Sequence, residues 1–175
     1  MDNAMTPREQ VRLDLATEVL RRFGQVRFVA HGSSMIPSIY PGDLLIARST
    51  AIADVCPGQI ILCSREGRFW THRVTRKWRE GERFIFATRG DALADEDPYL
   101  EEGQMLGRVT SIVRYGKPVQ LPRINSLWTK LLRCGVRNST SLTKALLRRH
   151  SLRMRLLGPS HELLTDPGTP FLECM

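Results

Sequence analysis

The 175-residue sequence contains no apolar run that approaches the roughly 18 residues needed by a transmembrane helix. Its first residues, MDNAMTPREQ, lack both the basic start and the apolar centre of a secretory signal peptide. Its four cysteines lack the spacing of a zinc site or of a dense disulfide framework. From these absences we expect a soluble cytoplasmic protein with free thiols, without a transmembrane segment, a signal peptide, a metal ion or a cofactor.

Acidic residues are absent from residues 117–161, which contain ten lysines and arginines. The preceding residues 1–116 are nearly balanced, with sixteen basic and fifteen acidic side chains. The net charge of +8 is therefore a property of the tail and not of the whole protein. The apolar and charged fractions, 42% and 25%, are those of a globular domain.

The stretch TPRE, residues 6–9, has the pattern of a capping box with proline at the first helical position. It predicts a helix over residues 7–23, which Gly24 would end. The apolar face of this helix would be formed by residues spaced four apart: Val11, Leu15, Val19 and Phe23.

Short runs of β-forming residues follow from Val26, separated by Gly, Pro or Asp. No helical spacing intervenes before Gly116, which favours an antiparallel β domain over residues 26–116. Two later stretches, SLWTKLLRCG and STSLTKALLRRHSLRMRLLG, have helical apolar spacing and end in glycine. We expect the final stretch, PSHELLTDPGTPFLECM, to be irregular because it contains three prolines.

We therefore predict a mainly β fold with an N-terminal helix and a basic, partly helical C-terminal tail. The helix would occupy residues 1–25, the β domain residues 26–116 and the extension residues 117–175. No internal repeat or low-complexity tract divides the sequence further.

The stretch HGSSMIPSIYPGD, residues 31–43, places two serines in a tight bend. A serine hydroxyl becomes a nucleophile only with a base within hydrogen-bond reach and an oxyanion hole beside it. Among the four histidines, His72 lies inside the alternating run RFWTHRVTRKW, where a strand would hold its ring in a fixed direction. His31 lies too near the serines in sequence to fold back on them easily, although it could flank the site. An ordinary, half-buried strand residue is the alternative for His72.

A third group is needed to orient the imidazole of such a histidine. The stretch TRGDALADEDP offers four acids directly after a predicted strand: Asp91, Asp95, Glu96 and Asp97. A solvated acidic loop is the alternative interpretation for most of them.

Four stretches, GSSMIPSIYPGDLL, THRV, TRGDA…D and GRV, resemble in order and spacing the sequence boxes of the signal peptidase I and LexA-like superfamily of serine peptidases. The resemblance covers about residues 26–116 and implies a LexA/signal-peptidase-like antiparallel β fold. It implies that Ser34, which directly precedes the methionine, is the nucleophile. It further implies that His72 is the base, as in the Ser-His type of the superfamily. Asp97 would complete the triad, with Asp91 as the second choice.

The sequence departs from the usual signal peptidases at Gly32, where those enzymes have a serine that helps to form the oxyanion hole. It resembles LexA-type proteins at that position. The hole would therefore rest on the backbone N–H of Ser34, aided by the hydroxyl of Ser33. A lysine could act as the base in place of histidine, as in LexA-type proteins. The only lysine of the predicted β domain is Lys77, which lies five residues beyond His72. Along a strand it would point to the opposite face, so we do not expect it to be the base.

The resemblance implies a serine endopeptidase that cleaves a peptide or protein precursor through an acyl-enzyme, with small side chains before the scissile bond. The alternative is a non-catalytic module of the same fold that binds a partner or an anionic membrane. Neither function requires a cofactor.

The basic residues 117–161 suggest a peripheral contact with an anionic membrane at its inner face. The apolar faces would be Trp128, Leu131 and Leu132 in the first stretch, and Leu142, Leu146 and Leu147 in the second. The alternative is that these faces pack on the β domain while the charges are solvated. Nucleic acid would suit the charge equally, but no DNA- or RNA-binding motif supports it.

Overall fold

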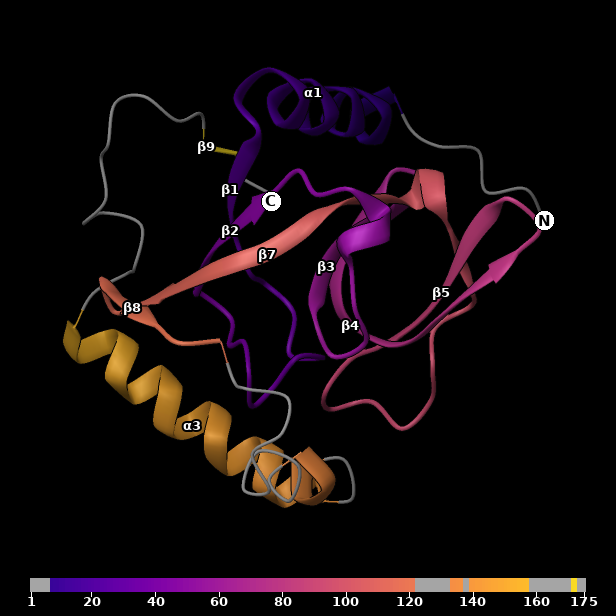
Figure 1. Ribbon diagram of the computed structural model, residues 1–175. Coiled ribbons are helices and arrows are strands. Elements are labelled where there is room, and N and C mark those ends of the chain that lie inside the picture. The colour runs from indigo at the N-terminus through magenta and orange to yellow at the C-terminus, as the bar shows by residue number, and fades with distance from the viewer. Residues whose placement is uncertain (1–6, 122–132, 137–138, 158–170, 173–175) are drawn as a thin grey trace.

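The computed structural model of the chain describes residues 7–121, 133–136, 139–157 and 171–172. Within them, one mainly antiparallel sheet is flanked by helix α1 (Pro7–Phe23) and helix α3 (Thr140–Leu157), as Figure 1 shows. The predicted fold class, mainly β with an N-terminal helix and a helix in the basic tail, is confirmed.

Nine strands form this sheet in the described part of the chain. They are β1 (Gln25–Val29), β2 (Leu44–Arg48), β3 (Ile60–Arg65), β4 (Arg68–Glu80), β5 (Arg83–Arg89), β6 (Leu100–Glu101), β7 (Met105–Arg114), β8 (Lys117–Val119) and β9 (Phe171–Leu172). Their order across the sheet is β6-β5-β4-β3-β7-β2-β1-β9, and β8 pairs with β7. Two short 3-10 helices, η1 (Ile52–Asp54) and η2 (Glu102–Gln104), precede β3 and β7.

Two tight hairpins show how local sequence sets the sheet topology. Glu66 and Gly67 connect β3 to β4, and Tyr115 and Gly116 connect β7 to β8. All four residues have a positive φ, between 52° and 72°. This is the geometry of a two-residue type I′ turn, whose twist matches that of the antiparallel strands it joins.

The sheet continues beyond residue 116, the predicted end of the β domain. Strand β8 follows directly, and β9 pairs in parallel with β1, with Phe171 opposite Arg27. The prediction that the final stretch is irregular is therefore wrong for these two residues of β9. Neither of them is a proline, so both of their N–H groups are available for strand pairing. A parallel pairing of segments so distant in the chain leaves no local signal in the sequence.

Helix α1 begins and ends where predicted, but its buried face is different. Ala16, Val19 and Leu20 are buried, with exposed fractions of 3%, 6% and 4%. Three residues of the predicted apolar face are instead exposed: Val11, Leu15 and Phe23. A helix rotates by about 100° per residue, so a spacing of four drifts by about 40° at each step. Only Val19 of the predicted series therefore falls against the sheet.

One buried apolar cluster joins α1 and the sheet to the loop between β1 and β2. Leu20 of α1, Phe28 of β1 and Leu45 of β2 belong to it, and so do Met35 and Ile39 of the loop. Burying a side chain of this size contributes roughly 1.5–3 kcal/mol. The loop that carries the candidate nucleophile is therefore anchored in the core of the domain.

Helix α3 confirms the second predicted helix of the tail. Residues 133–136 are also helical, but most of the first predicted tail helix lies outside the described residues, including Trp128, Leu131 and Leu132. Leu142, Leu146 and Leu147 of the second are half-buried. In the described ranges, no helix combines the length and the apolar character that crossing a membrane requires.

His150 attaches α3 to the β domain and is only 7% exposed. Its Nε2–H donates to the carbonyl oxygen of Pro41 at 2.8 Å, and its Nδ1 accepts from the hydroxyl of Tyr115 at 2.6 Å. Its ring also stacks on Tyr40, with 4.7 Å between the centroids. One face of the tail helix thus packs on the β domain, as one of the three interpretations of the basic tail predicts.

Candidate active site

Ser34 lies in a compact bend between β1 and β2, held by the apolar side chains that follow it. Met35, Ile36 and Ile39 are 3%, 0% and 2% exposed. The backbone N–H groups of Ser38 and Ile39 both donate to the carbonyl oxygen of Met35, at 2.8 and 2.9 Å. Ser34 itself is only half-buried. The bend therefore presents its serine near the surface while the neighbouring side chains enter the core.

His72 projects from β4 toward this serine. Its Nε2 lies 3.0 Å from Oγ of Ser34, and the residue is 7% exposed. His72 pairs with Ile61 of β3 within the antiparallel ladder, so the strand sets the direction of the ring. The structure thus places an imidazole within hydrogen-bond distance of the hydroxyl, which is the first requirement for a general base.

Asp97 lies on the other side of the imidazole. Its Oδ2 is 2.6 Å from Nδ1 of His72. Thr88, near the end of β5, holds Asp97 at two points: its hydroxyl donates to Oδ2 at 2.6 Å, and its carbonyl oxygen accepts from the backbone N–H of Asp97 at 2.8 Å. The structure therefore brings together Ser34, His72 and Asp97 in one continuous chain of hydrogen bonds.

The environment of Asp97 favours its ionised form. Burial is the largest single influence and raises the pKa of this carboxyl, but the hydrogen bonds from His72 and Thr88, together with the charges of His72 and Arg65, outweigh it. The pKa of Asp97 is therefore held below its usual value. An ionised carboxylate at this position can orient the imidazole and stabilise its protonated form.

Asp91, the second candidate for the triad, does not contact His72. Its carboxylate accepts from Arg73, at 2.8 Å from Nε and 2.7 Å from Nη2, and from the hydroxyl of Ser38. Arg133 of the tail lies 3.4 Å from it. The physical reason is strand alternation: Arg73 follows His72 along β4 and points to the opposite face, where it pairs with Asp91. The structure therefore places Asp91 beside the bend and away from His72.

The residues on either side of Asp91 approach the backbone of the candidate nucleophile. The N–H of Ala92 donates to the carbonyl oxygen of Ser34 at 2.8 Å. A Cβ atom at Gly90 would lie only 2.7 Å from the same oxygen. Glycine is therefore the residue that lets this loop close on the bend.

The remaining acids of the loop do not reach the histidine. Glu96 accepts from Thr75 at 2.7 Å and from Arg76 at 2.6 Å, and Asp95 is exposed. Lys77 donates to the backbone carbonyl groups of residues 52, 53 and 55, at 2.7, 2.8 and 3.0 Å. The prediction that strand alternation turns Lys77 to the opposite face is wrong, because the register of β4 against β5 shifts between Val74 and Arg76. These carbonyl groups, and not alternation, engage its amine.

The residues expected to form the oxyanion hole lie on the outer side of the bend. In the described part of the chain, the backbone N–H of Ser34 donates to no acceptor, so it is available to a developing oxyanion. Gly32 and Ser33 are both exposed. A Cβ atom at Gly32 would meet no atom within 4 Å. The space that a serine side chain would occupy at this position is therefore open.

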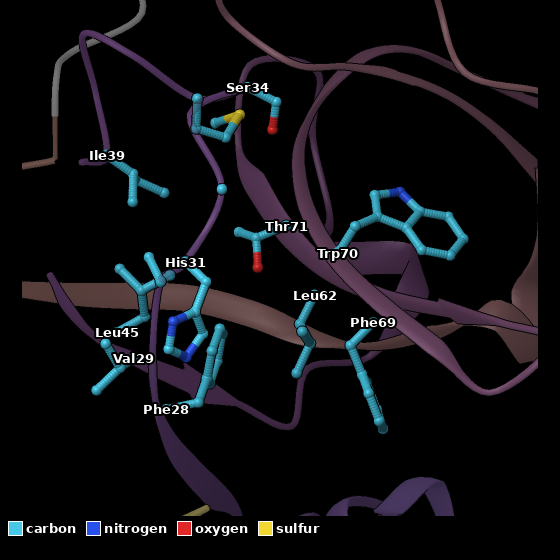
Figure 2. Close-up of a pocket in the computed structure, with 13 residues that line it drawn as sticks. Phe28, Val29, His31, Ser34, Ile39, Leu45, Leu62, Phe69, Trp70 and Thr71 are labelled. Atoms are coloured by element: carbon cyan, nitrogen blue, oxygen red, sulfur yellow. The ribbon is translucent and has the colours of Figure 1, made fainter. Parts of the chain in front are cut away.

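An apolar pocket opens beside Ser34 (Figure 2). Its volume is about 190 Å³. In Figure 2 the serine hydroxyl lies at one end of the pocket, and the rings of Phe28 and Phe69 lie toward the other. Ala30 and Gly32 also line it, and their small size leaves room near the hydroxyl of Ser34. A pocket with this lining can hold an apolar side chain of a bound peptide.

The sequence reasoning missed three polar residues that support the site. Arg73 and Ser38 hold Asp91, and Thr88 holds Asp97. Arg73 directly follows His72 in the stretch THRV, and Thr88 lies three residues before Asp91 in the stretch TRGD. This closeness in sequence to the candidate residues is the signal that could have identified them. His31, expected to flank the site, lines the apolar pocket.

No protein-family model matches the chain, and no curated protein matches it. Among the described residues, no group of His, Cys, Asp and Glu side chains is arranged to hold a metal ion. The interpretation of the site therefore rests on its geometry and on the resemblance of its sequence boxes.

Proposed function

We propose that the chain is a serine endopeptidase of the Ser-His type, similar to the signal peptidase I and LexA-like superfamily, that cleaves a peptide or protein precursor. The observation that supports this function is the line of hydrogen bonds from Ser34 through His72 to Asp97. These three side chains come from a bend, a strand and a loop. Hydroxyl, imidazole and carboxylate in this order form the arrangement that removes a proton from serine.

In the proposed reaction, Oγ of Ser34 attacks the carbonyl carbon of the scissile bond and Nε2 of His72 takes the hydroxyl proton. The carbonyl oxygen becomes negative and is stabilised by the backbone N–H of Ser34. The C–N bond then breaks, and the leaving amine takes the proton from His72. Water hydrolyses the acyl-enzyme with His72 again as base, and Asp97 stays ionised throughout.

Labelling with a fluorophosphonate probe tests the proposal. We expect the wild-type chain to be labelled, and Ser34→Ala and His72→Ala to lose the label. Ser49→Ala removes an exposed serine outside the site and is the matched control, which retains the label. A label that persists in Ser34→Ala would contradict the proposal. The alternative, a non-catalytic module of the same fold, predicts no labelling of the wild-type chain.

The pocket beside Ser34 supports a substrate with a large apolar side chain before the scissile bond. The resemblance implies a small side chain there, but about 190 Å³ is far more space than a methyl group fills. Each additional buried methylene contributes about 0.8 kcal/mol, or roughly fourfold in kcat/KM. A peptide series with Ala, Val, Leu and Phe at this position measures the preference. A kcat/KM that falls from Ala to Leu would contradict it.

A further inference from the structure

Helix α3 has a second face, which points away from the β domain. Its inner face is defined by His150, which is buried, and by Met154, whose Cε would lie 2.9 Å from a Cβ atom at Gly42. Leu152 and Leu156 each follow one of these residues by two positions, about 200° around the helix. They are 61% and 83% exposed. Two large apolar side chains are therefore directed into solvent.

Cations surround these two leucines. The exposed basic residues of the helix are Lys144, Arg148, Arg149, Arg153 and Arg155. The helix turns by about 100° per residue. Arg148 and Arg155 therefore lie beside Leu152 along one edge of this pair of leucines, and Arg149 lies beside Leu156 along the other edge. The helix contains no Asp or Glu. Its outer face is therefore an apolar strip with positive charge on both sides.

We propose that this outer face of α3 binds the surface of a bilayer that contains anionic phospholipids. Leu152 and Leu156 enter the boundary between headgroups and acyl chains, and the cations contact lipid phosphates. Two other partners fit less well. A nucleic acid would be held by the cations alone and would leave both leucines in water. A second copy of the chain would bring two positively charged faces together.

This proposal is independent of the proposed function, because no residue of the candidate triad belongs to α3. It does bear on where the candidate site would lie. Helix α3 packs on Pro41 and Gly42, at the end of the segment that begins with the bend. When α3 is bound to the bilayer, the end of this segment lies roughly 10 Å, about one helix diameter, from the lipid headgroups.

Co-sedimentation of the whole chain with lipid vesicles tests the proposal. The vesicles are phosphatidylcholine alone, or equal parts of phosphatidylcholine and phosphatidylserine, at low and at high salt. We expect binding only to the vesicles with phosphatidylserine, and weaker binding at high salt. Arg148→Gln with Arg155→Gln is expected to lower the partition coefficient about 25-fold, since each cation contributes about fivefold. Leu152→Ser with Leu156→Ser is expected to lower it at unchanged net charge.

Arg68→Gln with Arg83→Gln is the matched control, since it removes the same charge from exposed positions on β4 and β5. We expect it to retain most of the binding. Equal loss in this control and in the α3 arginine variant would overturn the proposal, and so would absence of binding at low salt. Tighter binding to a DNA or RNA oligonucleotide, insensitive to the leucine variant, would overturn it in favour of a nucleic-acid partner. All these variants replace exposed side chains, so each is expected to keep the circular dichroism spectrum of the wild type.

Discussion

The imidazole of His72 is held at both of its nitrogens, and this determines which proton it can move. Because Asp97 is a carboxylate and accepts only, Nδ1 of the ring carries the proton. Nε2 is then left as the acceptor for the hydroxyl of Ser34. Thr88 fixes the carboxylate from behind. The residue-level geometry therefore selects the tautomer that a general base requires.

The lowered pKa of Asp97 predicts how the stability of the fold depends on pH. The folded state favours ionised Asp97, so the contribution of this residue to the unfolding free energy is fully present above the ordinary aspartate pKa of about 4. The contribution is lost as the pH falls through the lowered pKa. Asp97→Asn removes it. We expect the difference in unfolding free energy between wild type and Asp97→Asn to be constant above about pH 4 and to shrink below it.

Urea denaturation at a series of pH values measures this difference. Asp95→Asn, which replaces an exposed acid of the same loop, is the matched control. A difference in unfolding free energy between wild type and Asp97→Asn that grows toward acid pH would contradict the prediction.

Gly32→Ser is predicted to increase the rate of acylation. A Cβ atom at this position meets nothing within 4 Å, so the serine side chain fits without displacing a neighbour. Its hydroxyl adds a donor to the oxyanion hole, and one such donor changes kcat by up to about 100-fold. Gly32→Ala adds the same Cβ without the hydroxyl and is the control. Equal probe-labelling rates for the serine and alanine variants would show that no new donor reaches the oxyanion.

At the scale of secondary structure, two pairs of arginine and carboxylate, one buried and one half-buried, hold the loop between β1 and β2. One is Arg73 with Asp91, beside the bend. The other is Arg114 of β7, which donates to both oxygens of Asp43 at 2.8 and 2.7 Å. Asp43 is 0% exposed and also accepts from the N–H of Tyr40. Such two-point pairs fix orientation as well as charge, and a nucleophile needs its position held to within about 0.5 Å.

Gly90→Ala is predicted to disturb this loop and the site together. The added methyl would lie 2.7 Å from the carbonyl oxygen of Ser34 and 3.0 Å from side-chain atoms of Leu93. Overpacking of this kind costs about 1–3 kcal/mol of stability, and here relief of the clash displaces Ser34, the candidate nucleophile. We expect lower stability in urea denaturation and slower probe labelling. Gly103→Ala, where a Cβ meets nothing within 4 Å, is the control. Gly90→Ala with wild-type stability and labelling would contradict the prediction.

Local patterns predict the parts of the molecule that local forces determine. The capping box and Gly24 predict both ends of α1, and the alternation of β4 accounts for the direction of His72. The buried face of α1 is not predictable in this way, because it depends on which part of the sheet lies beneath it. The partner of Asp91 is not predictable either, because it depends on where the loop after β5 lies relative to Arg73 of β4. The pairing of β9 with β1 joins distant segments without any local signal.

At the scale of the whole molecule, positive charge and candidate chemistry lie on different parts of the chain. The proposed triad lies in the β domain, whereas the acid-free stretch of residues 117–161 carries ten positive charges, more than the net charge of +8. Helix α3 connects the two through His150 and Pro41. The described part of the tail therefore reaches the surroundings of the candidate site in two ways: α3 packs on the end of the loop that carries it, and Arg133 lies 3.4 Å from Asp91.

His150→Ala is predicted to release α3 from the β domain. The variant loses the hydrogen bond to the carbonyl of Pro41, leaves the hydroxyl of Tyr115 without its nitrogen acceptor, and removes the ring stacked on Tyr40. Losing such buried hydrogen-bond partners costs about 1–3 kcal/mol, so α3 opens roughly 5- to 150-fold more often. Because Arg148 and Arg149 are accessible to trypsin once the helix opens, we expect faster cleavage there.

Limited trypsin digestion followed by mass spectrometry measures this cleavage. Ser151→Ala changes an exposed neighbour on the same helix and is expected to be cut at the wild-type rate. Since Pro41 follows the bend, the released helix is also expected to slow probe labelling of Ser34. Wild-type cleavage of His150→Ala would mean that other contacts hold α3. Faster cleavage with unchanged labelling would mean that the bend keeps its geometry without the helix, because the core and the two arginine pairs suffice to hold it.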